Sequence, residues 1–368
     1  MKYFWNLFKN IDKILLVLPL CFAAISVVMI SSTASEGRFV FDKYVSIQLL
    51  AYCLGFVAMA LILLIDYKIF ENWERPIYIG SILLLLTVYI PGLGVEQYGS
   101  RAWIDLKIMN FQPSEIVKIT FVILLALYFS RNHDNLRTYK GVIMSALYAS
   151  PFIVIVLKED LGGAIVLCFI WLAMVFYAGI DYKILGKFTC IFAISLPIVY
   201  RFMASHQKDR IDAFLHPDNL SLGGNYQVWQ SKVAIGSGGF LGKGLFQGTQ
   251  KELNFVPVQK SDFIFSVIVE ELGMLGGAVV VGLYTLFLFR IAKIANNAKE
   301  NYGSLIAIGF IGMFGFQIFE NIAMTMGIMP VTGVTLPFIS YGGSSVLANM
   351  IALGLILNVG IRSKIINF

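Results

Sequence analysis

The sequence has very little charge for a chain of its length. Only 14% of its 368 residues are Asp, Glu, Lys or Arg, whereas 58% are hydrophobic, and the mean hydropathy is +0.78. An ordinary soluble domain carries about 25% charged residues. The composition therefore excludes an ordinary soluble enzyme and predicts an all-α, polytopic integral membrane protein.

Residue patterns for nucleotide, metal and nucleic-acid binding are also lacking. Ser237 stands where a GxxxxGK phosphate-binding loop needs its first glycine, so we expect no nucleotide cofactor. The three histidines are scattered over loops and the four cysteines fall inside apolar stretches, without metal-ligand spacing. The net charge of +6 forms no clustered basic face, so nucleic acid is not an expected partner.

Apolar stretches close to bilayer length recur along the whole chain. They predict ten transmembrane helices, at residues 14–32, 46–66, 77–95, 114–130, 141–157, 161–180, 184–202, 262–289, 304–327 and 341–361. A long polar loop, residues 203–261, separates the seventh and eighth helices. No soluble domain can be separated, so residues 1–368 are expected to form a single transmembrane domain.

Lysine and arginine in the short loops predict the orientation. With the N-terminus in the cytoplasm, the short cytoplasmic segments carry fifteen Lys and Arg residues and the short outer loops carry five. The 203–261 loop is set aside because long segments translocate largely regardless of charge. We therefore expect both termini in the cytoplasm and this loop outside.

The polar segment 225–273 contains the most informative acid. Its glycines between residues 236 and 248 permit tight turns, which suit either a compact loop or the close approach of a bulky ligand. Asp262 then lies where the polar loop gives way to an apolar helix. It could cap that helix, or act as a general base, because a carboxylate is costly to keep at a membrane boundary without a role.

The segment 98–118 places charged residues at the start of another apolar helix. Pro113 suits a first helical turn, and Glu115 and Lys118 then lie three residues apart on one face. An ion pair that lowers the cost of two charges near the membrane is the simpler interpretation. The alternative is a site in which Lys118 and Arg101 bind an anionic ligand while Trp103 packs against it.

Two further segments interrupt the apolar pattern. Asp160 precedes an apolar run and is expected to cap its helix. After Glu320 and Asn321, the segment 327–345 contains prolines and glycines that break a helix. Irregular backbone at membrane depth occurs only where it is buried in protein or lines a wet cavity. We therefore expect a cavity near the outer face, with an amphipathic ligand.

Four of these segments together resemble the SEDS family of shape, elongation, division and sporulation proteins. They are FQPSEIVKI (111–119), YQVWQSKVAIGSGG (226–239), SDFIFSVIVEELG (261–273) and PVTGVTLPFISYGGSS (330–345). The similarity runs through almost the whole chain, in the family's order and with its ten-helix layout. The GKG and GTQ motifs after residue 241 resemble the elongation branch more than the division branch.

The resemblance implies an inverting peptidoglycan glycosyltransferase in the bacterial cytoplasmic membrane. Family members polymerise lipid II, a disaccharide-pentapeptide on undecaprenyl pyrophosphate, into β-1,4 glycan strands beside a class B penicillin-binding protein transpeptidase of the elongation machinery. The resemblance implies that Asp262 is the carboxylate on which catalysis depends, acting as the general base. A Mg²⁺ or Mn²⁺ ion could help to balance the charge of the leaving pyrophosphate. The residues expected to bind substrate are Arg101, Trp103, Glu115, Lys118, Asp160, Arg210, Gln230, Ser231 and Ser344.

The chain departs from the family pattern at three places. Residues 158–163 read KEDLGG where the family usually has QPDLGT, Val258 replaces a glutamate, and Ser261 replaces a threonine. The retained Asp262 preserves the expected activity, but Val258 cannot supply a second acid. A lipid-linked-sugar flippase and a noncatalytic scaffold are the alternatives. A carrier's site belongs near the membrane midplane, whereas these acids lie toward the outer face, and a scaffold would not need Asp262.

Overall fold

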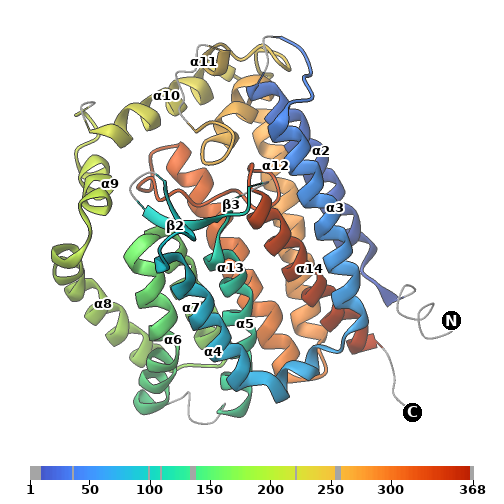
Figure 1. Cartoon of the computed structure of the whole chain (residues 1–368), viewed down its shortest axis with the longest axis vertical. Coiled ribbons are helices and arrows are strands. Elements are labelled where there is room, and N and C mark those ends of the chain that lie inside the picture. Colours follow the sequence, from blue (N-terminus) through green and yellow to red (C-terminus); the bar gives the residue numbers. More distant parts are fainter. Residues whose placement is uncertain are drawn as a thin grey trace.

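The structure is a bundle of long helices with smaller elements gathered at one end. It is a computed structural model, and it describes residues 10–34, 37–97, 100–107, 110–132, 138–219, 222–252 and 258–364. In Figure 1, helices α10 and α11 lie at the top of the view, α9 lies at the upper left, and the strands lie near the middle, above α4 and α6. We call this end the site end, because the candidate residues lie there.

Seven of the described helices are long and apolar enough to cross a membrane. They are α2 (Lys13–Thr33), α3 (Lys43–Leu64), α5 (Pro113–Arg131), α6 (Tyr139–Glu159), α12 (Ile264–Asn297), α13 (Asn301–Thr325) and α14 (Gly343–Lys364). The apolar helix α7 (Leu161–Tyr177) is shorter, and α4 (Glu74–Leu86) and α8 (Tyr182–Phe202) complete the set of main helices. The expected polytopic helical architecture is confirmed, while the total of ten spans stays a prediction.

Helices α5, α13 and α14 form the centre of the bundle. Between 72% and 89% of the residues in their apolar windows are buried, whereas α3, α6 and α12 bury about a third of theirs. The exposed residues of the outer helices are large and apolar, for example Leu61 of α3, Leu147 of α6 and Phe289 of α12. An apolar outer surface is what contact with lipid requires.

The third expected span, 77–95, is wrong in its second half. Helix α4 ends at Leu86, a 3₁₀ turn η2 (Thr87–Tyr89) follows, and the chain then enters a strand. Pro91 and Gly92 explain the break, because proline cannot continue a helix and Gly92 has a φ of +87°. Strands β1 (Gly94–Gln97), β2 (Ser100–Asp105) and β3 (Asn110–Phe111) form an antiparallel sheet in that order.

The segment expected as one long loop, 203–261, contains three helices. They are α9 (Ser205–Leu215), α10 (Gly223–Gly238) and α11 (Thr249–Glu252), and α10 packs against α12. A Cβ atom on Gly242 would overlap the Glu271 carbonyl oxygen, and Gly273 of α12 has a φ of +69°. Gly242 and Gly273 therefore allow close backbone packing, which agrees with the compact-loop interpretation.

Two buried acids of α12 fasten this segment to the bundle. Glu270 Oε1 lies 2.7 Å from Lys243 Nζ, and the Phe246 N–H donates to Glu271 Oε2 at 3.1 Å. The Ser32 hydroxyl of α2 also donates to Glu271 Oε1, at 2.5 Å. Hydrogen bonds and ion pairs of this kind offset the cost of burying a carboxylate, although Glu270 Oε2 has no hydrogen-bond partner among the described residues.

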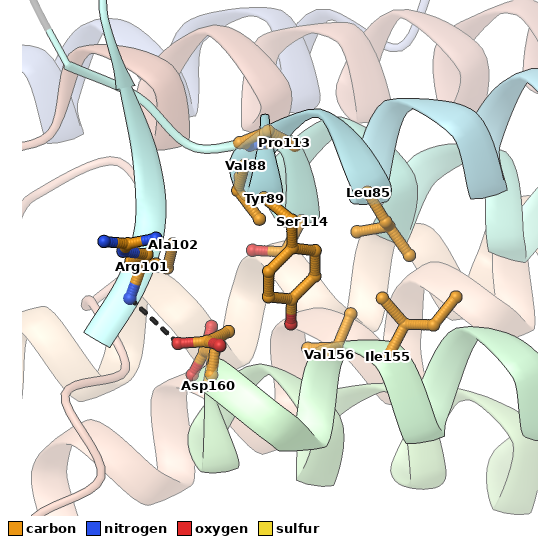
Figure 2. A pocket seen from close by; sticks show the side chains of 11 residues that line it. Leu85, Val88, Tyr89, Arg101, Ala102, Pro113, Ser114, Ile155, Val156 and Asp160 are labelled. Atoms are coloured by element: carbon orange, nitrogen blue, oxygen red, sulfur yellow. Dashed lines mark hydrogen bonds between the residues drawn. The ribbon is translucent and has the colours of Figure 1, made fainter. Parts of the chain in front are cut away.

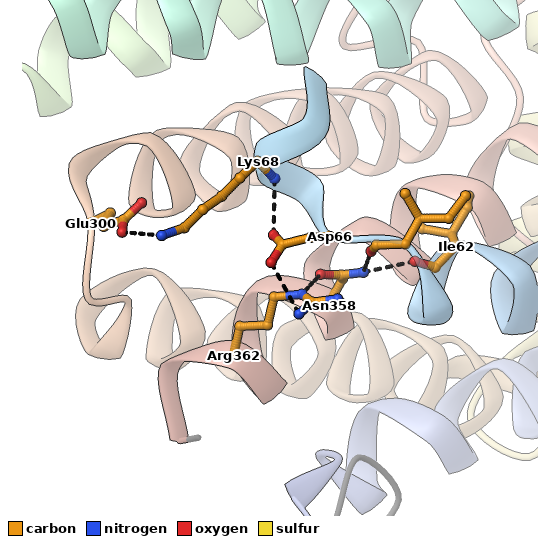
Figure 3. Close-up of polar contacts among 7 residues, drawn as sticks. Ile62, Asp66, Lys68, Glu300, Asn358 and Arg362 are labelled. Carbon is orange, nitrogen blue, oxygen red and sulfur yellow. Dashed lines mark hydrogen bonds and ion pairs between the residues drawn. The ribbon is translucent and has the colours of Figure 1, made fainter. Parts of the chain in front are cut away.

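The opposite end of the bundle is closed by polar contacts of α14 (Figure 3). Asn358 Nδ2 donates to two carbonyl oxygens at the end of α3, and Arg362 Nη1 lies 3.1 Å from Asp66 Oδ2. Lys68, in the 3₁₀ helix η1 (Tyr67–Trp73), pairs with Glu300 before α13. These contacts tie α3, α13 and α14 together, far along the helices from the site end.

Candidate active site

Asp262 lies in the turn of residues 258–263, directly before α12. Its backbone is fixed at both ends: the N–H donates to the Val258 carbonyl at 3.2 Å, and the carbonyl accepts from Asn321 Nδ2 at 3.0 Å. The N-cap of α12 is Phe263, and no side chain caps this helix. The capping role considered for Asp262 is therefore wrong, and its partly buried carboxylate is available for chemistry.

Arg210 of α9 meets Asp262 over the backbone of Gly333. A Cβ atom built on Gly333 would lie 3.6 Å from Asp262 Oδ2 and 3.7 Å from Arg210 Nη1. Arg210 Nη1 also donates to the Thr332 carbonyl at 2.8 Å, and Gly333 has a φ of +81° that glycine adopts without strain. Three segments far apart in the sequence thus converge on one carboxylate.

Asp160, between α6 and α7, supplies a second carboxylate. Its Oδ1 accepts from the Gly163 N–H at 2.8 Å, which confirms the expected helix cap. Its Oδ2 accepts from Gln112 Nε2 at 3.1 Å. The charges of Lys118 and Arg210 lower the pKa of Asp160 and that of Glu115 raises it, so Asp160 is coupled electrostatically both to α5 and to Arg210.

Glu115 and Lys118 form the buried ion pair that their spacing predicts. Lys118 Nζ lies 2.8 Å from Glu115 Oε2, and both side chains are less than a tenth exposed. The two charges sit within α5, and each compensates the other in a place where an unpaired charge would be costly. The ion-pair interpretation is confirmed, and a further contact of Lys118 with a ligand stays a prediction.

Burial raises the pKa of both Asp160 and Asp262 above the ordinary aspartate value. At Asp262 the neighbouring charge of Asp160 acts in the same direction, while Ser261 and Arg210 lower the pKa. A carboxylate with a raised pKa holds a proton more tightly and is a better base near neutral pH. The environment of Asp262 therefore suits proton transfer.

Arg101 and Trp103 both lie on β2, and Arg101 lines a separate pocket (Figure 2). The pocket encloses about 290 Å³, partly open to solvent, between β2 and the site ends of α4, α5 and α6, and Asp160 lines it. The Arg101 N–H donates to Glu159 Oε2 at 2.9 Å, while its guanidinium is exposed, 3.7 Å from Glu96 Oε2. No hydrogen bond or ion pair within the described residues joins Arg101 to Lys118.

Glu159 belongs to the KEDLGG departure, and the structure gives it a role. Its carboxylate and its carbonyl oxygen hold β2, through the Arg101 N–H and the Ser100 hydroxyl at 2.9 and 2.7 Å. Lys158 lies 4.5 Å from the centre of the Tyr89 ring, a cation–π contact. The two substituted residues therefore attach the sheet and η2 to the α6–α7 turn beside Asp160.

The three remaining predicted residues are buried and support the site end. Gln230 and Ser231 are on α10, where Gln230 Nε2 donates to the Tyr226 hydroxyl at 3.0 Å and Ser231 Oγ donates to the Thr325 carbonyl at 2.7 Å. Ser344 is in the first turn of α14. Within the described part of the chain, no hydrogen bond joins any of these three residues to Asp262, and their contact with substrate stays a prediction.

Comparisons with known proteins decide the family. The model of the family that comprises FtsW, RodA and SpoVE, described as "cell cycle protein", matches residues 11–365. The chain belongs to the FtsW/RodA/SpoVE family. This is the family that the four motifs indicate, and membership makes the chain a multi-pass membrane protein.

Relatives of several names match this FtsW/RodA/SpoVE family member over its length. Stage V sporulation protein E of Bacillus subtilis is 34% identical, covering 96% of this chain and 98% of the relative. Peptidoglycan glycosyltransferase MrdB of Escherichia coli K12 is 32% identical, covering 100% and 97%. A probable peptidoglycan glycosyltransferase FtsW of Geobacter is 33% identical, covering 97% and 98%. These sequence identities are too similar to assign the chain to the sporulation, elongation or division branch of the family.

Solved structures give the same fold. A chain from a study of structural coordination of polymerization and crosslinking by a peptidoglycan synthase complex matches with a TM-score of 0.81 at 30% identity, covering 96% of this chain and 98% of the solved one. The rod shape determining protein RodA of Thermus thermophilus matches with a TM-score of 0.69 at 28% identity, with the same coverage. The helix arrangement is therefore that of the family.

Sequence reasoning did not select three residues that the structure places at the site. Gln112 bonds Asp160, Gly333 separates Arg210 from Asp262, and buried Glu320 accepts from the Thr332 hydroxyl at 2.9 Å. Gln112 and Gly333 lie inside motifs that carry the family resemblance, and that position was the available signal, whereas Glu320 lies outside all four motifs. Their roles depend on contacts between segments, which one sequence does not reveal.

The side chains at this site do not form a ready metal site. Among the described residues, no group of three or more His, Cys, Asp or Glu side chains could hold an ion together. Both oxygens of Asp160 already accept hydrogen bonds, and Arg210 occupies the space beside Asp262. The reaction proposed for this site therefore uses protein side chains alone.

Proposed function

We propose that this chain polymerises lipid II into β-1,4 glycan strands, with Asp262 as the general base, during cell elongation and maintenance of cell shape. The chain is a peptidoglycan glycosyltransferase, as are the relatives of that name that match it from end to end. One observation carries the mechanism: a partly buried carboxylate lies beside a guanidinium, at the end of an apolar bundle. A lipid-linked sugar, which is polar at one end and apolar at the other, suits such a place.

The proposed reaction is a single displacement. The 4-hydroxyl oxygen of the acceptor sugar bonds to the anomeric carbon of the donor, and its proton passes to Asp262. The bond from that carbon to the diphosphate oxygen breaks, and the electron pair leaves with undecaprenyl pyrophosphate. One displacement inverts the anomeric carbon and needs no covalent enzyme intermediate.

The leaving diphosphate gains negative charge, which a positioned cation would stabilise. Arg210 is the favoured candidate, because its guanidinium is next to Asp262 and is bonded only to a neutral carbonyl in the described contacts. Lys118 is already neutralised by Glu115 at 2.8 Å. Arg101 lies across the β2 pocket and pairs with Glu96. We therefore propose that Lys118 and Arg101 help to position the substrate, and that neither stabilises the leaving group.

The partners proposed are lipid II, membrane lipid and a class B penicillin-binding protein of the elongation machinery. The solved relative comes from a complex in which polymerization and crosslinking are coordinated, which supports a crosslinking partner. The proposed orientation places both termini in the cytoplasm and the site end outside. The lysine and arginine distribution supports it.

The decisive experiment compares Asp262→Asn with the native chain, purified with its penicillin-binding protein and supplied with lipid II. Asparagine keeps the shape but cannot accept the proton, so polymerisation should fall roughly 10²–10⁴-fold, the usual loss of a general base. Asp105→Asn, at an exposed carboxylate of β2, is the matched control and should stay active. Near-normal glycan synthesis by a folded Asp262→Asn protein would refute the mechanism.

A further inference from the structure

A second pocket adjoins Arg210, between α9, α10 and the segment after α13. It encloses about 360 Å³, partly open to solvent. Its lining includes two basic residues, Arg210 and Lys232, and no acidic residue. Most of the rest is apolar, including Phe214, Val228 and Met329. A pocket with two cations and apolar walls suits an anionic group attached to an apolar molecule.

Lys232 is held at this pocket without a counter-ion. It makes no hydrogen bond or ion pair with any residue that the structure describes, whereas Lys243, later in the same polar segment, is paired with buried Glu270. A Cβ atom on Gly327, whose φ is +71°, would lie 2.6 Å from Lys232 Nζ. The missing side chain at Gly327 therefore gives the ammonium group its place against the backbone.

Arg210 connects the pocket to the reacting carboxylate. It lines the pocket, and it also shares the space over Gly333 with Asp262. An anion in the pocket would therefore lie beside the place where the acceptor hydroxyl loses its proton. In an inverting transfer from a lipid carrier, the donor's diphosphate leaves from the face of the anomeric carbon opposite the attacking hydroxyl, so it lies within a few ångströms of the base on the other side of that carbon. The acceptor's own diphosphate is a disaccharide away, so the diphosphate near the base is the donor's.

We propose that Arg210 and Lys232 together bind the diphosphate of the lipid-linked donor. This inference rests on the proposed function and adds to it a residue, Lys232, and a place, the pocket between α9 and α10. Arg210 offers a planar fork for the phosphate nearest the anomeric carbon, and Lys232 a mobile ammonium group for the other. Within the described residues neither cation forms an ion pair with a carboxylate, in contrast to Lys118, which Glu115 neutralises.

An anionic phospholipid headgroup shares this chemistry, since it also joins a phosphate to an apolar tail. The test therefore measures ligand binding in neutral and in anionic membranes. The probe is farnesyl pyrophosphate, titrated into the Asp262→Asn protein in phosphatidylcholine vesicles with and without phosphatidylglycerol. The Asp262→Asn background keeps binding separate from turnover.

Lys232→Met should weaken farnesyl pyrophosphate binding roughly tenfold or more in both kinds of vesicle, the usual loss of one charge-assisted contact. Lys232→Arg keeps the charge and should bind within a few-fold of the parent. Lys208→Met is the matched control, because Lys208 is a partly exposed lysine of α9 that bonds the Arg201 carbonyl and does not line the pocket. It should leave binding unchanged.

Equal affinity of Lys232→Met and the parent in neutral vesicles would overturn the proposal. So would a Lys232→Met effect that appears only with phosphatidylglycerol, because the pocket would then be a phospholipid site. An equal loss in Lys208→Met would reduce the effect to general surface charge and would also overturn it. Glycan polymerisation by Asp262→Asn, by contrast, would refute the proposed role of Asp262 as base. It would not change the measured affinity for farnesyl pyrophosphate, so the two proposals can fail separately.

Discussion

Arg210, from α9, and Asp262, from the turn before α12, both approach the bare backbone of Gly333. The guanidinium is held by the Thr332 carbonyl, and Asn321 bonds both the Asp262 and the Val334 carbonyls, at 3.0 and 2.8 Å. The segment after α13 thus acts as a common support for a cation and a base.

The pH dependence of polymerisation should respond to the two neighbours of Asp262 in opposite directions. The base acts when deprotonated, so kcat/KM should fall as the pH drops through its raised pKa. Arg210 lowers that pKa, so Arg210→Gln should move the acid limb to higher pH. Asp160 raises it, so Asp160→Asn should move the limb to lower pH. Profiles of log kcat/KM against pH measure this, and shifts of the same sign in both variants would contradict the assignment.

Gly333→Ala should reduce activity more than stability. The added Cβ would lie in van der Waals contact with both Asp262 and Arg210 and would force an alanine to adopt a φ of +81°. Backbone strain of about 1 kcal/mol or more should shift the segment around residue 333, and with it the Asp262 carboxylate and the Arg210 guanidinium. Polymerisation should drop at least tenfold while the melting temperature changes little. Gly315→Ala, at a glycine of α13 with open space around it, is the control.

Glu115 and Lys118 should behave as a coupled pair. Each single substitution, Glu115→Gln or Lys118→Met, leaves the other charge buried, at a cost of about 3–5 kcal/mol. The double variant removes both charges and should recover folding, as measured by thermal melting in detergent. If Lys118 also positions substrate, the folded double variant should remain slow. Full activity of the double variant would rule out that ligand role.

The proposed orientation predicts which residues an impermeant thiol reagent reaches in intact cells. His216→Cys, after α9, should react in a background without the native cysteines, and Asn297→Cys, at the end of α12, should react only after lysis. Ser221, in the same polar segment, lies outside the described residues. The reverse labelling pattern would invert the topology.

A divalent ion remains a proposal that chelation can test. Without three acidic, histidine or cysteine ligands within the described residues, we expect any Mg²⁺ or Mn²⁺ to act through the diphosphate and not through a protein site. EDTA should then lower the rate, while the melting temperature of the substrate-free protein should not change on adding either ion. A clear rise in that temperature would show a protein site.

Local residue patterns were enough to predict much of this protein. Bilayer-length apolar runs gave the long helices, because backbone in lipid must satisfy its own hydrogen bonds. The spacing of Glu115 and Lys118 gave their ion pair, and Asp160 gave its cap. These features depend on neighbours within a turn of helix, so a single sequence contains them. The family motifs then indicated the chemistry and Asp262.

Only the tertiary structure decided which segments meet. The sequence did not predict the early end of α4, because a break at Pro91 and Gly92 can be a kink or a strand, and pairing between β1 and β2 settles it. One interpretation of the sequence was a site in which Lys118 and Arg101 bind the same anionic ligand. In the structure the Arg101 N–H bonds Glu159, and it is Arg210 that approaches Asp262. The sequence also left Lys232 unnoticed on α10. Such contacts join residues far apart in the chain, and their geometry is set by how the helices pack, which no local pattern specifies.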